Sequence, residues 1–166
     1  MKKKILFVIG ILCIFILGYV MYKNSYKYKL SHLYENPLKI NQTYKDYTYN
    51  EYDNYVTILT YDGKDKKVIV PEFINDKPVY AIDDSAFYGN THVEKVVIPR
   101  EVIRIGHQAF IGCEHLKEVT LPDNIVDLGE WSFKVCTDLK KINVKKGTKT
   151  DRSLKKSPFK QYINYK

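Results

Sequence analysis

The stretch "AFIGCEHLKEVTLP", residues 109–122, has a close counterpart on either side of it. "AFYGNTHVEKVVIP" stands at residues 86–99 and "SFKVCTDLKKINVK" at residues 132–145, so each copy begins 23 residues after the one before. The copies extend without gaps into three units, residues 79–101, 102–124 and 125–147. Because columns of apolar or small residues keep register through all three units, the spacing predicts a repeat architecture.

Each unit can be interpreted as one coil of a solenoid. The segments "VEKVVIP", "LKEVTLP" and "LKKINVK" alternate apolar and polar residues, which predicts a short strand with one buried face. Pro99 and Pro122 would end the first two strands by removing a ladder donor. The "AF" pair then begins a short helical or irregular segment whose phenylalanine fills the core. Since one unit cannot bury its apolar face alone, we expect the strands to stack in parallel.

The run "IGHQAFIGCEHLKEVTLP", residues 105–122, resembles the repeat of the BspA-like leucine-rich repeat family, I-G-x-x-A-F-x-x-C-x-x-L-x-x-V-x-L-P. The resemblance covers residues 55–147, and residues 55–78 are similar to the family's first hairpin, which would cap the exposed edge of the first coil. It implies an α/β-type leucine-rich-repeat solenoid of a secreted or cell-surface binding protein, without a cofactor. Val135 and Lys145 depart from the pattern, as in a terminal repeat.

An uncharged stretch, "ILFVIGILCIFILGYVMY" at residues 5–22, follows the basic start "MKKK". At ~1.5 Å per residue a helix of this length spans about 27 Å, close to the thickness of a bilayer's hydrocarbon core. We therefore predict a transmembrane signal-anchor over residues 1–22, in a single-pass cell-membrane protein whose C-terminal domain is extracellular. Cleavage as a signal peptide, which would release a secreted protein, and lipid modification of Cys13 are the alternatives.

The net charge of +8 is concentrated toward the ends of the chain. Residues 23–50 are rich in lysine and tyrosine, which predicts a stalk or linker. Residues 51–147 are mildly acidic, and we expect them to form the repeat domain. For residues 148–166 two interpretations stay open. They are either a cap whose aromatic side chains cover the last coil, or a tail that binds anionic surfaces. The basic residues of that tail are Lys149, Arg152, Lys155, Lys156 and Lys160.

Two columns of the repeat hold residue types that can form a disulfide or bind a metal ion. Cys113 and Cys136 share one column, so stacking would place them about one strand spacing apart, ~5 Å, which allows a disulfide. The alternative is two buried thiols that act as small apolar side chains. His92, His115 and Asp138 share another column, which we interpret as a solvated ladder of loop residues, and we predict no metal site.

The sequence holds no nucleophile, metal-binding or phosphate-loop motif, so we predict no catalytic residue and no enzymatic activity. The leading hypothesis is a monomeric, membrane-tethered module that binds an extracellular protein or glycan, with no nucleic acid partner. The alternative is a structural envelope component held against anionic polymers by its basic C-terminal residues. On the concave face of the strands we expect the ligand to contact Lys95, Val97, Glu118, Thr120, Lys141 and Asn143.

Overall fold

The computed structural model describes Met21 and residues 25–166, and the chain divides into two units, residues 1–35 and 36–166. In the first unit the helix α2 runs from Tyr26 to Ser31. The predicted transmembrane segment, residues 1–22, lies outside the described residues apart from Met21. None of the helices in the described part of the chain has the length and apolar character needed to span a membrane.

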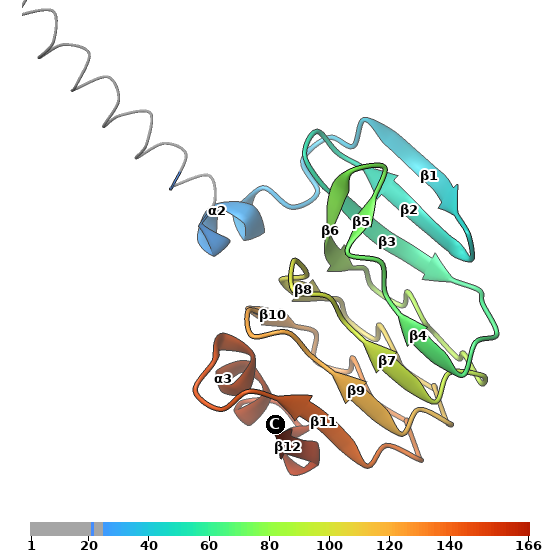
Figure 1. The fold of residues 1–166 in the computed structure, drawn as a ribbon, viewed down its shortest axis with the longest axis vertical. Coiled ribbons are helices and arrows are strands. Elements are labelled where there is room, and N and C mark those ends of the chain that lie inside the picture. The colour runs from blue at the N-terminus through green and yellow to red at the C-terminus, as the bar shows by residue number, and fades with distance from the viewer. Residues whose placement is uncertain (1–20, 22–24) are drawn as a thin grey trace, which may run out of the picture. The chain divides into compact units, whose positions relative to one another are not determined.

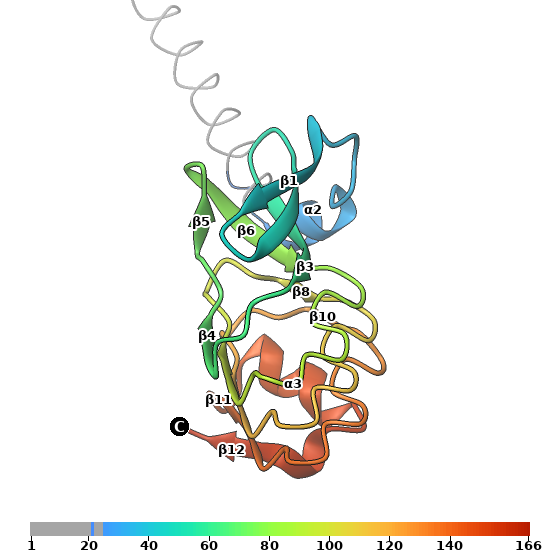
Figure 2. The same cartoon turned by 90° about the vertical axis from the view of Figure 1, so that its right-hand side faces the viewer.

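The second unit is a β-solenoid of about five turns, in which successive coils stack along one axis (Figure 1 and Figure 2). Each repeat contributes one strand to each of two sheets. The five-stranded sheet has the order β12-β11-β9-β7-β4. Its strands are β4 (Lys67–Ile69), β7 (Lys95–Val97), β9 (Glu118–Thr120), β11 (Lys141–Val144) and β12 (Ile163–Tyr165).

The second sheet has the order β1-β2-β3-β6-β8-β10, with β5 paired to β6. Within it β3, β6, β8 and β10 run parallel, whereas β1, β2 and β3 form an antiparallel meander at the N-terminal end. Its strands are β1 (Lys39–Tyr44), β2 (Tyr47–Glu51), β3 (Val56–Tyr61), β5 (Phe73–Ile74), β6 (Lys77–Ile82), β8 (Arg104–Ile105) and β10 (Asp127–Leu128).

A column of aromatic rings runs through the core between the two sheets. Tyr61, Phe87, Phe110 and Phe133 stack in succession, with centroid distances of 4.9, 4.6 and 5.3 Å. Phe159 closes the column edge-on, 5.4 Å from Phe133. The phenylalanines of the predicted "AF" column therefore occupy the core as expected, and each coil supplies a ring to it.

The connecting segments are turns, and the N-terminal cap differs from the sequence-based expectation. Between the strands of the central repeats the chain forms turns, the irregular one of the two expected alternatives, so the fold is a β-solenoid consistent with a leucine-rich repeat. The strands β3 and β4, which were expected to form a hairpin, pair in parallel with β6 and β7 respectively. They therefore belong to different sheets and build the first coil. The antiparallel cap comes instead from β1 and β2, within residues expected to be a stalk.

The C-terminal residues form a last coil. Helix α3 runs from Lys149 to Lys155 and is followed by the 3-10 helix η1 (Lys160–Tyr162) and by β12, which pairs in parallel with β11. Thr148 caps α3 by accepting a hydrogen bond from the Asp151 N–H. Leu154 and Phe159 are buried, at 0% and 6% exposure, so the aromatic and aliphatic residues of this segment cover the third repeat.

Candidate functional site

The outer face of the five-stranded sheet carries all the residues predicted as the ligand surface. The central residue of each strand points into the core, with Val68, Val96, Val119 and Ile142 no more than 3% exposed. Its neighbours therefore point outward, because side chains alternate along a strand. The outer face, as we use the term, consists of Lys67, Ile69, Lys95, Val97, Glu118, Thr120, Lys141 and Asn143.

Glu118 lies at the centre of a ladder of charges on this face. The ammonium groups of Lys95 and Lys141, from the coils on either side, each lie 3.3 Å from a Glu118 carboxylate oxygen. The side chain of Glu118 is 21% exposed, whereas those of the lysines are 54% and 46% exposed. A hydrogen bond from Asn143, followed by the two lysines, lowers the pKa of Glu118. The ladder therefore presents its positive groups to solvent and holds its carboxylate below them.

A second ladder of the same kind runs through the residues that immediately precede strands β4, β7 and β9. The Lys117 and Lys66 ammonium groups lie 2.7 and 3.0 Å from the two oxygens of Glu94. The Lys117 hydrogen bond, supported by Lys66, lowers the pKa of Glu94 from 4.5 to about 2. Both ladders therefore hold an ionised carboxylate between two lysines of the neighbouring coils.

Side-chain amides form a third row beside the charges. The Asn143 Nδ2 donates to Glu118 Oε1 at 2.7 Å and to Thr120 Oγ1 at 3.3 Å. Asn164 of β12 in turn donates to Asn143 Oδ1 at 2.6 Å. Asn143 is 8% exposed, so this part of the outer face is held in place by its own hydrogen bonds, which fix the positions of Glu118 and Thr120.

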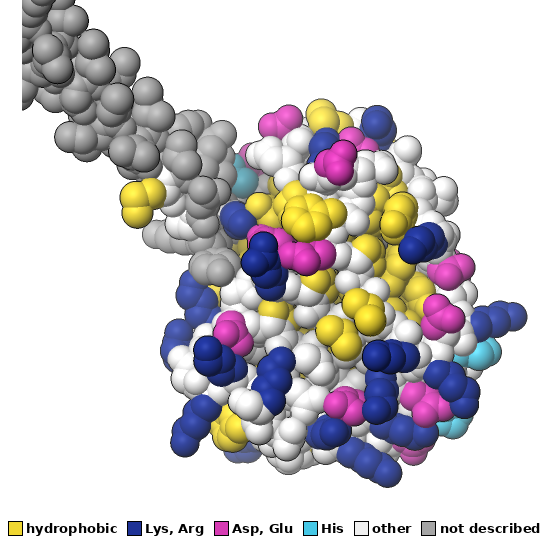
Figure 3. Space-filling view, viewed as in Figure 1, with side chains coloured by type: hydrophobic (Ala, Val, Ile, Leu, Met, Phe, Trp, Pro, Cys, Tyr) yellow, Lys and Arg dark blue, Asp and Glu magenta, His cyan; other side chains and the backbone are white. Residues whose placement is uncertain are grey.

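The N-terminal end of the same face is apolar apart from Lys67. Ile69 is 63% exposed and lies in register with Val97, and Phe73 of β5 is 48% exposed. Figure 3 shows the hydrophobic side chains of this side of the domain gathered over its upper half, with some charged ones among them, whereas charged side chains predominate over the lower half. The outer face thus changes from apolar to charged along the solenoid axis.

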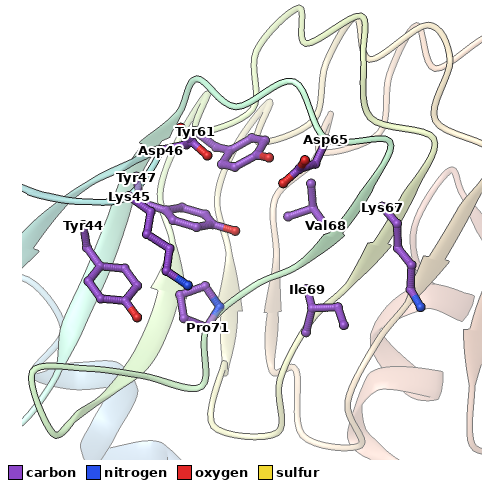
Figure 4. Close-up of a pocket in the computed structure, with 10 residues that line it drawn as sticks. All are labelled: Tyr44, Lys45, Asp46, Tyr47, Tyr61, Asp65, Lys67, Val68, Ile69 and Pro71. Atoms are coloured by element: carbon purple, nitrogen blue, oxygen red, sulfur yellow. The ribbon is translucent and has the colours of Figure 1, made fainter.

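A cleft of about 230 Å³ opens beside this apolar end, between the β1–β2 turn and β4 (Figure 4). The turn consists of Lys45 and Asp46, and Lys45 has a positive φ of 53°. Tyrosine rings line the cleft together with two carboxylates and two ammonium groups. The tyrosines are Tyr44, Tyr47 and Tyr61, and the charged residues are Lys45, Asp46, Asp65 and Lys67.

The tyrosine hydroxyls of the cleft are unusually placed. The Tyr61 hydroxyl is buried and has no hydrogen-bond partner among the described residues. Burial, followed by the Asp65 carboxylate, raises the pKa of Tyr61, and the backbone of Asp65 opposes the rise. Burial, Tyr61 and Asp46 likewise raise the pKa of Tyr47, so both phenols stay protonated and can donate. Gly63 leaves room for the Tyr61 ring, which a Cβ at that position would strike.

Sequence reasoning did not identify this cleft. Tyr47 and Tyr49 alternate with polar residues and are buried, at 6% and 3% exposure, so a strand pattern was present in the segment expected to be a stalk. The approach of the β1–β2 turn to residues 61–71 depends on how the meander folds back over the first coil. No spacing in the sequence signals that approach.

Cys113 and Cys136, the two residues that could have formed a disulfide, are free thiols in the core. Cys113 Sγ donates to the Phe87 carbonyl at 3.0 Å, and Cys136 Sγ donates to the Phe110 carbonyl at 3.1 Å. Burial raises the pKa of each thiol to about 12. The structure therefore has the apolar arrangement and not the disulfide. Asn90 plays the same part in the first repeat, since its amide donates to the Gly63 carbonyl at 3.0 Å.

The histidine column lies in exposed loops. His115 Nδ1 lies 3.3 Å from the Asp138 carboxylate, and the His92 N–H donates to the side chain of Asn90. In the part of the chain that the structure describes, no three His, Cys, Asp or Glu side chains cluster closely enough to hold a metal ion.

The basic residues predicted as an anionic-surface site belong to the folded C-terminal coil. Arg152 donates to the Gly147 carbonyl at 2.8 Å, and Lys155 donates to Asp151 at 3.0 Å. Lys149 begins α3, and Lys156 and Lys160 are exposed. These side chains therefore surround the cap and do not extend as a free tail.

Comparison with protein families gives a match over more than half of the chain. The family model described as "BspA type Leucine rich repeat region (6 copies)" matches residues 73–166. That range includes the C-terminal coil, which the sequence-based resemblance, over residues 55–147, did not reach. No curated protein sequence matches the chain.

Several solved structures share the fold. The T. pallidum leucine rich repeat protein TpLRR is 31% identical, with a TM-score of 0.58, and the match covers 61% of this chain and 49% of that one. A leucine rich cell surface protein from Faecalibacterium prausnitzii is 28% identical, with a TM-score of 0.53, over 63% of this chain and 33% of that one. A leucine-rich repeat protein from Bacteroides capillosus is 25% identical, with a TM-score of 0.61, over 80% and 99%. The chain thus spans half or less of the first two.

Proposed function

Because the chain belongs to the BspA-type leucine-rich repeat family, we propose that it is a non-catalytic module that binds an extracellular protein or glycan on its outer face. Residues 1–22 would tether it to the cell membrane, with the repeats outside. The Faecalibacterium prausnitzii neighbour is a cell surface protein, which favours the same location here. The thiols of Cys113 and Cys136 are buried and poor nucleophiles, which agrees with a binding role.

The observation that carries the proposal is the composition of the outer face. Ile69 offers apolar area at one end, and the Lys95 and Lys141 ammonium groups stand above the recessed Glu118 at the other. Polar and apolar groups side by side on an ordered surface are what a specific interface requires. The bound surface should offer carboxylates or hydroxyls opposite the lysines.

The test uses the full-length protein with a C-terminal tag on intact cells. Protease treatment should remove the tag and leave a membrane-bound remnant; a tag protected until the membrane is broken would contradict the proposed topology. Untreated cells from the same culture are then applied to arrays of extracellular proteins and of glycans. Lys95→Glu/Lys141→Glu should abolish retention, whereas Lys134→Glu/Lys146→Glu makes the same change of charge outside the outer face and should not. Equal retention of both variants would exclude the outer face.

The folded C-terminal coil favours a second function, that of a structural envelope component bound to anionic polymers. Arg152, Lys156 and Lys160 are exposed around the cap. Attachment through them would weaken with salt, since exposed charges are screened within about 8 Å at physiological ionic strength. Charge reversal at these three positions tests it without uncovering Leu154 and Phe159. Salt-insensitive attachment that survives the reversal would contradict this function.

A further inference from the structure

The cleft beside the apolar end of the outer face has the chemistry of a small-ligand site. It combines hydrogen-bond donors and acceptors without a net charge, since Asp46 and Asp65 balance Lys45 and Lys67. A cation would meet the two lysines and an anion the two carboxylates, so neither is favoured over water. A neutral ligand with many hydroxyl groups can use both kinds of partner, because each hydroxyl donates and accepts.

The hydroxyl of Tyr47 is the donor that the cleft offers a ligand. The residue is 6% exposed, so its ring is held by the core, and its hydroxyl points into the cleft (Figure 4). A phenol fixed in this way can both donate and accept a hydrogen bond. The Tyr61 hydroxyl is buried beneath the lining and is not offered to a ligand.

Aromatic and apolar groups form the remaining walls. The Tyr44 ring is half-buried, and the Lys45 ammonium lies 5.4 Å from its centre. Ile69 and Pro71 lie across from it, on the side of the outer face (Figure 4). The volume of about 230 Å³ is below the roughly 300–1,000 Å³ typical of pockets for drug-sized ligands. The cleft therefore suits a single ring with an apolar face and a polar rim.

We propose that this cleft binds one sugar ring of a glycan, stacked on Tyr44 and hydrogen-bonded by Tyr47 and Asp65. The proposal rests on the binding function above and assigns its ligand class. The sugar's apolar face lies on the Tyr44 ring, and its hydroxyls accept from the Tyr47 phenol and donate to the Asp65 carboxylate. A chain continuing from that ring passes over Ile69 onto the outer face.

The proposal can be tested by saturation-transfer difference NMR on the full-length protein in a polyoxyethylene ether detergent, since alkyl glycoside detergents would compete. The probes are the methyl glycosides of glucose, galactose, mannose and N-acetylglucosamine. At least one should receive saturation and bind with a measurable Kd. Tyr44→Ala should weaken binding roughly 3- to 10-fold by removing the stacked ring. Tyr47→Phe should weaken it by a similar factor through one lost hydrogen bond.

Tyr88→Ala is the matched control, because Tyr88 is 69% exposed and lies outside the cleft. Its Kd should equal that of the parent. Urea midpoints of all variants establish that each is folded. The proposal fails if no glycoside receives saturation, or if the Tyr44 and Tyr47 variants bind as the parent does. Saturation of a lysine-containing tripeptide instead of the sugars would make the cleft a peptide site and overturn it as well.

The outer-face variant separates this inference from the proposed function. Glycoside binding that persists in Lys95→Glu/Lys141→Glu, in cells that are also retained normally on the arrays, supports the cleft and contradicts the outer face. Loss of retention in that variant without any glycoside binding to the parent protein supports the outer face and contradicts the cleft.

Discussion

The Tyr165 hydroxyl donates a hydrogen bond of 3.0 Å to Asp151 Oδ1 and so joins the last strand, β12, to helix α3. Asp151 is 1% exposed, and its Oδ2 accepts from the Gly147 N–H at 2.8 Å and from Lys155 at 3.0 Å. The Gly147 hydrogen bond, followed by those from Lys155 and Tyr165, lowers the pKa of Asp151. One carboxylate therefore holds the C-terminal coil together.

Removing the phenolic oxygen should loosen this coil. Tyr165→Phe is expected to lower the free energy of unfolding by roughly 0.5–1.5 kcal/mol, because one hydrogen bond to a carboxylate is lost. Asp151→Asn should cost more, since it disturbs three partners at once. Urea denaturation measures both. Tyr162→Phe in the adjacent 3-10 helix is the control, and an equal loss there would argue against the role of Asp151.

The aromatic column should dominate the stability of the solenoid. Phe110 is fully buried between Phe87 and Phe133, so Phe110→Ala is expected to cost about 3–5 kcal/mol. Tyr88→Ala changes an exposed aromatic residue next to Phe87 in the sequence and should stay within about 0.5 kcal/mol of the parent. Thermal or urea unfolding of the two variants checks the prediction, which a small effect at Phe110 would contradict.

Val135 should be replaceable with a gain in stability. Its φ is 61°, and the two earlier repeats have Gly89 and Gly112 at the same place, with φ of 63° and 71°. A β-branched residue in this conformation is strained, and the Val135 side chain is 53% exposed, so little packing is lost. We expect Val135→Gly to stabilise by about 0.5–1 kcal/mol and Gly112→Val to destabilise by about 1–2 kcal/mol. Urea midpoints that move the other way would show that the φ angle is not the cause.

The lysine–glutamate ladders should make stability fall in acid. The pKa values of Glu94 and Glu118 are lowered in the fold from 4.5, and that of Glu94 lies at about 2. Their stabilising effect is therefore fully present above about pH 4.5 and is lost as the pH falls through the folded values. Urea midpoints from about pH 7 to about pH 2 should decline with a slope that Glu118→Gln reduces. Glu114→Gln, at an exposed loop position, should leave the slope unchanged, and high salt should diminish it.

The buried thiols should not react while the protein is folded. Because burial raises the pKa of Cys113 and Cys136 to about 12, almost no thiolate forms near neutral pH. In a Cys13→Ser background, which removes the third cysteine, a thiol reagent should label neither residue until urea unfolds the chain. Labelling of the native protein at the rate of a free thiol would contradict the core position. Failure to label the unfolded protein without a reductant would reveal a disulfide.

The regular part of the solenoid was predictable because its spacing is constant. Columns that recur every 23 residues placed β7, β9 and β11 and the rings of Phe87, Phe110 and Phe133. The ends were not predictable by this route. Tyr61 precedes Phe87 by 26 residues and Phe159 follows Phe133 by 26, so both ring positions fall out of the repeat. They join the column because their rings pack against Phe87 and Phe133 in the core, although their positions do not follow the period of 23 residues.

The candidate sites likewise divide into residues that the sequence pattern predicts and residues that only the tertiary structure brings together. The outward strand residues followed from alternation, and the structure places Lys95, Glu118 and Lys141 in one row. That Glu118 lies below its two lysines depends on side-chain conformation, which alternation does not specify. The tyrosine cleft depends on where the β1–β2 turn folds relative to β4, a tertiary contact between segments with no repeat in common.

The parallel register of the outer face gives it a fixed step. Each coil adds one outward row at intervals of about 4.8 Å, and each coil contacts only its neighbours. A duplication of residues 102–124 would therefore lengthen the surface by one step while both capped ends stay folded. The length of the surface is therefore set by the number of repeats, which a single duplication of the coding sequence changes by one whole step.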